Sequence, residues 1–413
     1  MIIYQALTRL FGDGKFRSFD AQAYESLRAL GVSHIWFTGV PRHSAGQPWV
    51  KGTLGSPYAI SDYYDVNPYL ADDQASRLAE FDALVERTHE EGFGVVMDFV
   101  PNHVAPDYSD RCGGISTHRY CDWDWTDTRK IDWADPSTPP RMLAILKFWA
   151  SKGVDAFRVD MAELVGPEVL GKLISGLKTE WPAVKFIGEV YDINSYARFA
   201  AAGFDLLYDK SGVYDILRGI REGRRSAREL TSHWQMLGPL QDRMLNFLEN
   251  HDEQRLRSWA PEGYLAGVAY AALFNKASFL LYFGQENGEA APESNDGRTS
   301  IFNDGRHIKA MDPAAADWTA RYAALMSLAS SSLCTEGSNW DLAYLQGPQS
   351  GFDANRHAAF LRYDSTGRAI AVLCNFSGSK AVTRLALPDS IGLCRTEVCL
   401  EAAPYDYSIT EIK

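Results

Sequence analysis

Strand-like apolar runs alternate with amphipathic helical stretches along most of this chain, and this alternation is what most limits its fold. Eight runs rich in β-branched and aromatic residues are predicted to be strands: Ile2–Leu7, His34–Phe37, Val95–Phe99, Ala156–Asp160, Phe186–Glu189, Leu206–Tyr208, Met244–Leu248 and Phe279–Phe283. Helical patterns lie between them, at Asp20–Leu30, Gln74–Glu91, Pro140–Ser151, Pro167–Lys178, Arg225–Leu237 and Tyr264–Lys276. Eight strands separated by helices predict an α/β protein with a (β/α)8 TIM barrel.

Two segments break this alternation and predict additional domains. Residues 104–132 follow the third strand, have no helical period and are rich in Asp, Trp, Gly and Tyr. From about residue 334, the strand-like runs Ala358–Tyr363 and Ala369–Phe376 flank a turn-like Asp364–Gly367. We therefore predict a barrel of residues 1–103 and 133–333, a short inserted subdomain of residues 104–132, and a C-terminal antiparallel β-sandwich of residues 334–413.

Composition excludes some classes of partner. The formal net charge of -12 argues against nucleic acid or an anionic membrane surface as a partner. There is no apolar run long enough to predict a membrane span. Met1 leads directly into the first predicted strand, without a charged leader, so we expect a cytoplasmic protein unless a leader has been trimmed. Composition does not indicate the oligomeric state.

The cysteines raise the question of disulfides and of zinc. The chain has 6 cysteines, and in a cytoplasmic protein we expect reduced thiols. Cys112, His118 and Cys121 are close enough in sequence to be considered as zinc ligands, but no fourth ligand is obvious.

Charged and polar residues stand at the ends of four of the predicted strands. The carboxyl ends of parallel barrel strands meet at one mouth, so these residues are expected to converge there. They are Asp98 and His103, then Arg158 and Asp160, then Glu189, then His251 and Asp252. Convergent carboxylates of this kind suggest glycoside chemistry.

Each carboxylate has a chemical interpretation and a structural alternative. Arg158 and Asp160 are two residues apart on a strand and face the same side, so the arginine can hold the aspartate ionised as a nucleophile. The apolar lead-in to Glu189 raises its pKa, which suits a general acid and base. Asp252 can stabilise a cationic transition state. The structural alternatives are an ion pair, a helix cap and a turn.

The four segments resemble the four sequence regions of the α-amylase family of retaining glycoside hydrolases (glycoside hydrolase family 13), in order and in residue type. The segments are Met97–His103, Phe157–Asp160, Ile187–Glu189 and Asn250–Asp252. The resemblance implies that Asp160 is the nucleophile, that Glu189 is the acid/base and that Asp252 stabilises the transition state.

The same resemblance implies which residues bind the sugar at the point of cleavage. Arg158, His103 and His251 are expected to line that subsite, and Asp98 matches the family's aspartate in the first region. Gly55–Tyr64 is similar to the family's loop after the second strand, and this places Tyr58 against the sugar ring. Tyr282–Glu286 is similar to the family's eighth-strand ending.

The chain departs from the family pattern where calcium binds in some members. Asn102 matches the family's calcium-binding asparagine, and further oxygens come from Asp122, Asp124, Asp127 and Asp132. However, Met161–Leu164 lacks the family's Lys-His ending, which puts calcium and part of the +2 sugar site in doubt. We expect no required cofactor, with calcium possible through Asn102.

The expected function is therefore retaining hydrolysis of α-1,4-glucosidic bonds in starch, glycogen or maltooligosaccharides, through a covalent glycosyl-enzyme. A transglycosylase or phosphorylase on the same scaffold is the main alternative, because only the acceptor differs. A non-catalytic sugar-binding scaffold protein is the third possibility, and the complete set of Asp160, Glu189 and Asp252 argues against it. The expected partner is an α-glucan, and the sequence does not determine endo or exo action.

Overall fold

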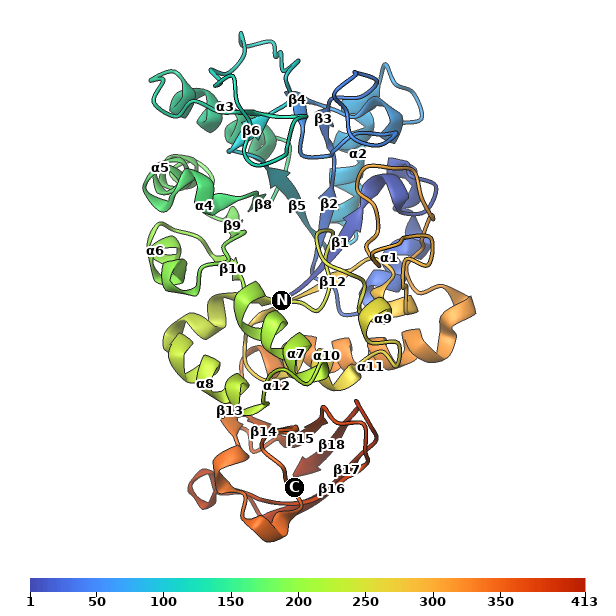
Figure 1. Cartoon of the computed structure of the whole chain (residues 1–413), viewed down its shortest axis with the longest axis vertical. Coiled ribbons are helices and arrows are strands. Elements are labelled where there is room, and N and C mark those ends of the chain that lie inside the picture. Colours follow the sequence, from blue (N-terminus) through green and yellow to red (C-terminus); the bar gives the residue numbers. More distant parts are fainter. Residues whose placement is uncertain (413) are drawn as a thin grey trace.

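A closed barrel of eight parallel strands forms the body of the protein, and a smaller sheet domain continues its long axis (Figure 1). The structure, a computed structural model, describes residues 1–412. Around the barrel the strand order is β1-β12-β11-β10-β9-β8-β5-β2. The strands are β1 (Ile2–Leu7), β2 (His34–Thr38), β5 (Gly94–Phe99), β8 (Ala156–Val159), β9 (Lys185–Gly188), β10 (Leu206–Tyr208), β11 (Met244–Asn246) and β12 (Ser278–Tyr282). The predicted (β/α)8 barrel is thus confirmed.

Helices surround the barrel and connect its strands (Figure 1). They are α1 (Ala21–Ala29), α2 (Arg77–Glu90), α3 (Thr138–Ser151), α4 (Ala162–Val165), α5 (Pro167–Lys178), α6 (Tyr196–Ala201), α7 (Asp215–Arg221), α8 (Arg228–Leu237), α9 (Leu256–Trp259), α10 (Leu265–Leu273), α11 (Ala316–Ser330) and α12 (Ser332–Thr335). None of the helices within residues 1–412 is long and apolar enough to cross a membrane.

Alternation along the strands divides their side chains between two hydrophobic clusters. Ile3, Trp36, Val96 and Ala156 belong to one cluster, which fills the barrel. The apolar side chains on either side of them in sequence face the surrounding helices and belong to the larger cluster. The inward register continues to the strand ends, where it reaches Gln5, Thr38, Asp98 and Arg158. Because every second residue of a strand faces the barrel interior, the residues that follow the core side chains place their polar groups at the mouth.

The chain leaves the barrel twice near its mouth. The segment after β2 contains the antiparallel pair β3 (Pro41–His43) and β4 (Ile60–Val66), which sequence analysis did not predict. Asn67 holds this excursion in place, because its side-chain amide donates to the carbonyls of Gly39 and Pro41 at 2.9 Å each. After β5, the predicted insert contains the short pair β6 (His103–Val104) and β7 (Arg129–Lys130). The domain limits at 104, 133 and 334 stay a prediction.

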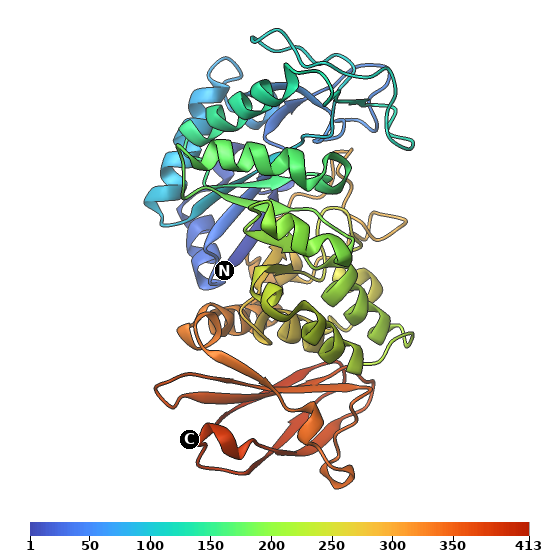
Figure 2. The same cartoon turned by 90° about the vertical axis from the view of Figure 1, so that its left-hand side faces the viewer.

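The C-terminal part is an antiparallel sheet domain, which confirms its predicted class (Figure 2). One sheet has the order β13-β14-β15-β18, and β16 and β17 form a second sheet. The strands are β13 (Ser338–Asp341), β14 (His357–Tyr363), β15 (Ala369–Asn375), β16 (Ala381–Ala386), β17 (Glu397–Ala402) and β18 (Tyr407–Ile412).

The two central strands of the larger C-terminal sheet, β14 and β15, are buried on both faces. Phe360 of β14 meets Phe274 and Tyr270 near the end of α10, at 5.3 and 6.1 Å between ring centroids. Leu361 faces the other way, into a cluster that includes Leu400 of β17. Burial on two faces explains the continuous apolar runs of β14 and β15 and the complete burial of α10.

Candidate active site

One buried arginine gathers the carboxylates at the barrel mouth. Arg158 has a fully buried side chain, and its Nη1 lies 2.6 Å from Oδ1 of Asp160. Its Nη2 lies 2.9 Å from Oε1 of Glu189 and 3.9 Å from Oδ2 of Asp252. Nη1 is also 3.5 Å from Oδ1 of Asp98. The structure therefore brings together four carboxylates predicted from sequence around one guanidinium.

Aromatic faces enclose the same guanidinium. Its central carbon lies 5.4 Å from the ring centroids of Trp36 and Tyr58 and 5.6 Å from that of Tyr208. Cation–π attraction strengthens when the partners are desolvated, as they are here. The Trp36 indole N–H also donates to Oδ2 of Asp98 at 3.0 Å. The barrel interior thus fixes Arg158 from below, and the carboxylates fix it from the mouth.

The site carries more acidic groups than cations, and this favours proton uptake. Burial raises the pKa of Asp160 and of Glu189, and the nearby Arg158 opposes that rise without cancelling it. Burial also raises the pKa of Asp98, to about 7. A cluster of this kind can retain a proton near neutral pH, which a general acid requires.

Asp252 is the carboxylate most open to the cleft. Its side chain is 38% exposed, and Oδ2 lies 3.1 Å from Nε2 of His251. Desolvation in the cleft, followed by repulsion from Glu189, raises the pKa of Asp252. Its position lets it contact a bound sugar directly, unlike Asp98, whose side chain is only 3% exposed.

Two groups that sequence analysis missed hold Glu189. The backbone N–H of Met161 donates to Oε2 at 2.6 Å, and the hydroxyl of Tyr191 donates to Oε1 at 2.7 Å. Met161 has the left-handed angles φ 43° and ψ 46°, which are costly for a residue with a side chain. That turn, directly after Asp160, points the N–H at the glutamate. Tyr191 lies two residues beyond Glu189, and that spacing was the only feature of the sequence that could have indicated this contact.

His251 is fixed by a hydrogen-bond chain that reaches the first strand. Tyr58 stacks on it with ring centroids 5.1 Å apart, and the Tyr58 hydroxyl lies 2.6 Å from Nε2. Nε2 of Gln5, from β1, lies 2.8 Å from Nδ1 of His251. Burial, with repulsion from Arg158, holds the pKa of His251 well below its usual value, so the ring is neutral. The contact of Gln5 was not predicted from sequence.

The carboxylates open into a cleft of about 400 Å³ whose lining combines acids with aromatic rings. Asp160, Glu189 and Asp252 line it together with Tyr58 and His103. Burial lowers the pKa of His103 to about 4, so this imidazole is also neutral. Further walls come from the insert and from the loop after β12, namely Trp123, Trp125, Asp127, Thr128, Ile301 and Phe302. Neutral imidazoles, carboxylates and flat apolar faces together suit the hydroxyls and ring faces of a sugar.

In the region considered for calcium, lysine side chains pair with two of the aspartates. The side-chain amide of Asn102 donates to Oδ2 of Asp122 at 2.8 Å, and Nζ of Lys130 lies 2.9 Å from Oδ1 of the same carboxylate. Asp127 lies 3.5 Å from Nζ of Lys51. These oxygens already have cationic partners, and residues 1–412 contain no group of three acidic, histidine or cysteine side chains that could hold a metal. The donor set around Asn102 does not fit calcium.

Among the described residues 1–412, Cys112, His118 and Cys121 do not form a group of three that could hold a metal. His118 stacks on Tyr120 with centroids 4.8 Å apart, and it lies 3.7 Å from Asp132. Cys112 and Cys121 are free thiols, as are Cys334, Cys374, Cys394 and Cys399.

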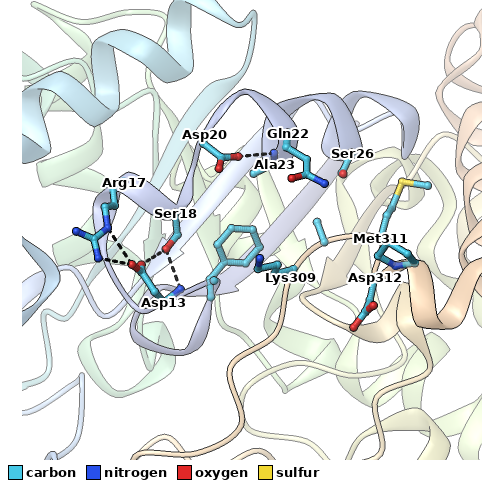
Figure 3. Close-up of a pocket in the computed structure, with 14 residues that line it drawn as sticks. Asp13, Arg17, Ser18, Asp20, Gln22, Ala23, Ser26, Lys309, Met311 and Asp312 are labelled. Carbon is cyan, nitrogen blue, oxygen red and sulfur yellow. Dashed lines mark hydrogen bonds and ion pairs between the residues drawn. The ribbon is translucent and has the colours of Figure 1, made fainter.

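A second, larger cavity of about 570 Å³ lies between the segment at the start of α1 and residues 309–313 (Figure 3). Several of its charged side chains already have partners. Arg17 pairs with Asp13 at 2.6 Å, and Asp20 accepts from the backbone N–H of Ala23 at 2.9 Å, as an N-cap of α1. None of the residues predicted to form the site lines it. We therefore place the chemistry in the smaller cleft.

Glu286, at the end of the segment that resembles the family's eighth-strand ending, is a buried acid with incomplete bonding. Oε1 accepts from the Tyr4 hydroxyl at 2.8 Å, whereas Oε2 has no partner among the described residues 1–412. Burial raises the pKa of Glu286 to about 7. A carboxyl whose pKa is raised on folding binds a proton more tightly in the folded protein. Its contribution to the free energy of unfolding is therefore present at acidic pH and is lost as pH rises through about 7.

We expect Glu286→Gln to remove this pH dependence. Between about pH 4 and pH 8, the unfolding free energy of the variant relative to wild type should rise by about 3 kcal/mol, because the neutral amide has no proton to lose. Denaturant unfolding at the two pH values measures it. Glu90→Gln, the same change at an exposed position of α2, should follow wild type. Parallel pH profiles for Glu286→Gln and wild type would contradict the expectation.

Comparison with known proteins gives one consistent result. The family model "Alpha amylase, catalytic domain" matches residues 21–127. Alpha-amylase 3 of Dictyoglomus thermophilum is 25% identical over 279 residues, covering 56% of this chain and 53% of that protein. The intracellular maltogenic amylase of Bacillus subtilis is 24% identical over 298 residues, covering 64% and 48%. The chain therefore spans about half the length of these relatives.

Solved structures share the fold over the whole chain. The noncanonic maltogenic alpha-amylase AmyB from Thermotoga neapolitana has a TM-score of 0.76 at 23% identity, covering 100% of this chain and 96% of that one. An alpha-amylase from Lactobacillus plantarum has a TM-score of 0.75 at 21% identity, covering 100% and 98%.

Proposed function

We propose that this chain is a member of the α-amylase family and a retaining glycoside hydrolase that cleaves α-1,4-glucosidic bonds of starch, glycogen or maltooligosaccharides. The observation that carries the proposal is the single guanidinium of Arg158, which contacts both Asp160 and Glu189, at 2.6 and 2.9 Å. Two carboxylates tied to one small planar group stay close together, as a retaining mechanism requires.

The proposed reaction assigns a role to each carboxylate. Asp160 attacks the anomeric carbon, and Glu189 gives its proton to the leaving glycosidic oxygen. The covalent glycosyl-enzyme then reacts with a water molecule from which Glu189 takes a proton. Asp252, open to the cleft, stabilises the positive charge that develops on the sugar. The raised pKa of Glu189 supports its role as the proton donor.

We also propose that this reaction needs no calcium. The ammonium group of Lys130 lies 2.9 Å from Asp122 and supplies the positive charge beside Asn102. The proposed roles of Asp160, Glu189 and Asp252 involve no metal.

A product profile tests this function. Incubation with soluble starch and with maltooligosaccharides should give shorter sugars and new reducing ends, separated by chromatography and counted by a reducing-sugar assay. Parallel reactions with EDTA should proceed at the same rate, because Lys130 occupies the position beside Asp122.

Other outcomes would select the alternatives. Longer sugars without new reducing ends would indicate a transglycosylase, and sugar phosphates formed with inorganic phosphate would indicate a phosphorylase. Binding without turnover would leave a sugar-binding scaffold protein. Loss of activity in EDTA, restored by calcium, would contradict the calcium-free proposal.

A further inference from the structure

We infer that this enzyme acts on the non-reducing ends of α-glucan chains, because a bridge of loops closes one side of its cleft. The inference rests on the proposed function and specifies its substrate. The closing element is the short segment Lys51–Leu54, here called the strap, in the excursion between β3 and β4. Lys51 lines the same cleft as Asp160 and Glu189, so the strap lies directly beside the chemistry.

The strap is tied to the loop that follows β12. The backbone N–H of Leu54 donates to the carbonyl of Phe302 at 2.9 Å. The backbone N–H of Thr53 donates to Oδ1 of Asn303 at 3.0 Å. Phe302 also lines the cleft, so these bonds join the walls of the cleft itself.

The other end of the strap is tied to the insert after β5. Nζ of Lys51 donates to the carbonyl of Asp124 at 3.1 Å and lies 3.5 Å from Oδ1 of Asp127. Three loops that leave three different strands are therefore joined above one part of the mouth. A continuous bridge of this kind blocks an α-glucan that would extend past it.

The barrel order shows which side of the cleft is closed. The loops after β2 and β12 flank β1. In the ring of eight strands, β9, which carries Glu189, is four positions from β1 in either direction. Glu189 donates its proton to the leaving oxygen, so the leaving part of the substrate lies toward β9. The strap therefore closes the opposite side, where the non-reducing part of the substrate must lie.

Gly52 makes the close approach of the strap possible. Its φ is +66°, and a Cβ there would lie 2.5 Å from the Phe302 carbonyl oxygen and 2.6 Å from Oδ1 of Asn303. Any side chain at this position must push the strap away from the loop after β12. The position therefore offers a substitution that opens the bridge without touching the carboxylates.

Two substrates that differ only at one end test the inference. Maltoheptaose with a chromophore on its reducing end is compared with the same compound carrying an ethylidene acetal on its non-reducing glucose. We expect wild type to cleave the blocked compound at least about a hundredfold more slowly, because the blocked end does not fit behind the strap. Equal rates would overturn the inference and leave the proposed function standing. Turnover of neither compound would overturn the proposed function.

A matched pair of glycine variants tests the strap itself. Gly52→Ala should raise the blocked-to-unblocked rate ratio at least about tenfold. Gly46→Ala is the control, because Gly46 is in the same loop at φ +70° but has no atom within 4 Å of the point where a Cβ would lie. A ratio that stays at the wild-type value in Gly52→Ala, or rises equally in both variants, would overturn the role of the strap.

A third variant keeps the test decisive if Gly52→Ala does not fold. Asn303→Ala removes the acceptor of the Thr53 N–H and leaves the backbone of the strap intact. Its blocked-to-unblocked ratio should also rise, by a smaller factor, because the bond between Leu54 and Phe302 remains. An unchanged ratio in a folded Asn303→Ala protein would overturn the role of the strap.

Discussion

Asp160→Asn is expected to lower kcat by at least about four powers of ten, because an amide is not a nucleophile toward the anomeric carbon. The fold should survive, since the side chain keeps its shape and its oxygen can still accept from Arg158, which lies 2.6 Å away in wild type. Initial rates on a chromogenic maltooligosaccharide measure the loss, and circular dichroism verifies the fold.

The same aspartate-to-asparagine change at the surface of the protein is the control for Asp160→Asn. Asp82→Asn, on α2, alters an aspartate that pairs with Lys152 and is 49% exposed. It should keep wild-type kcat within a factor of about two. If Asp160→Asn retained more than about a hundredth of wild-type kcat, the nucleophile would have to be another residue.

Arg158→Met is expected to destabilise the protein by about 3–5 kcal/mol near neutral pH, because it leaves buried carboxylates without their cation. Asp98, Asp160 and Glu189 all lie within 3.5 Å of the guanidinium and are at most 8% exposed. Methionine has a similar length and is apolar, so little of the effect comes from lost volume. Denaturant unfolding monitored by fluorescence gives the free energy difference.

The loss of unfolding free energy in Arg158→Met should depend on pH in a definite direction. Without the arginine, the pKa values of these carboxyls rise further, so the folded variant binds more protons than folded wild type. Its stability is therefore lost as pH rises through those values, and the deficit is larger at about pH 8 than at about pH 5. Arg28→Met breaks an exposed pair with Glu91 and should cost within about 1 kcal/mol at either pH. A deficit that shrinks toward alkaline pH would contradict this account.

The barrel and the charged ends of its strands could be predicted from the sequence alone. Strand and helix periods are local properties, so the alternation was readable residue by residue. In a closed parallel barrel, all strands end at one mouth. Asp160, Glu189 and Asp252 could therefore be predicted to converge, and the structure places all three near Arg158. Their roles in catalysis stay a prediction.

Contacts between residues far apart in the chain became visible only in the folded protein. Gln5 reaches His251 across 246 positions, and Thr53 reaches Asn303 across 250. No local period encodes such pairs, because they depend on how the strands close and on how each loop packs. The ion pair beside Asn102 is of the same kind: Lys130 lies 2.9 Å from Asp122, and only the folded insert brings the two side chains together. Local patterns therefore determine where chemistry can occur, whereas long-range packing determines the charges and the shape around it.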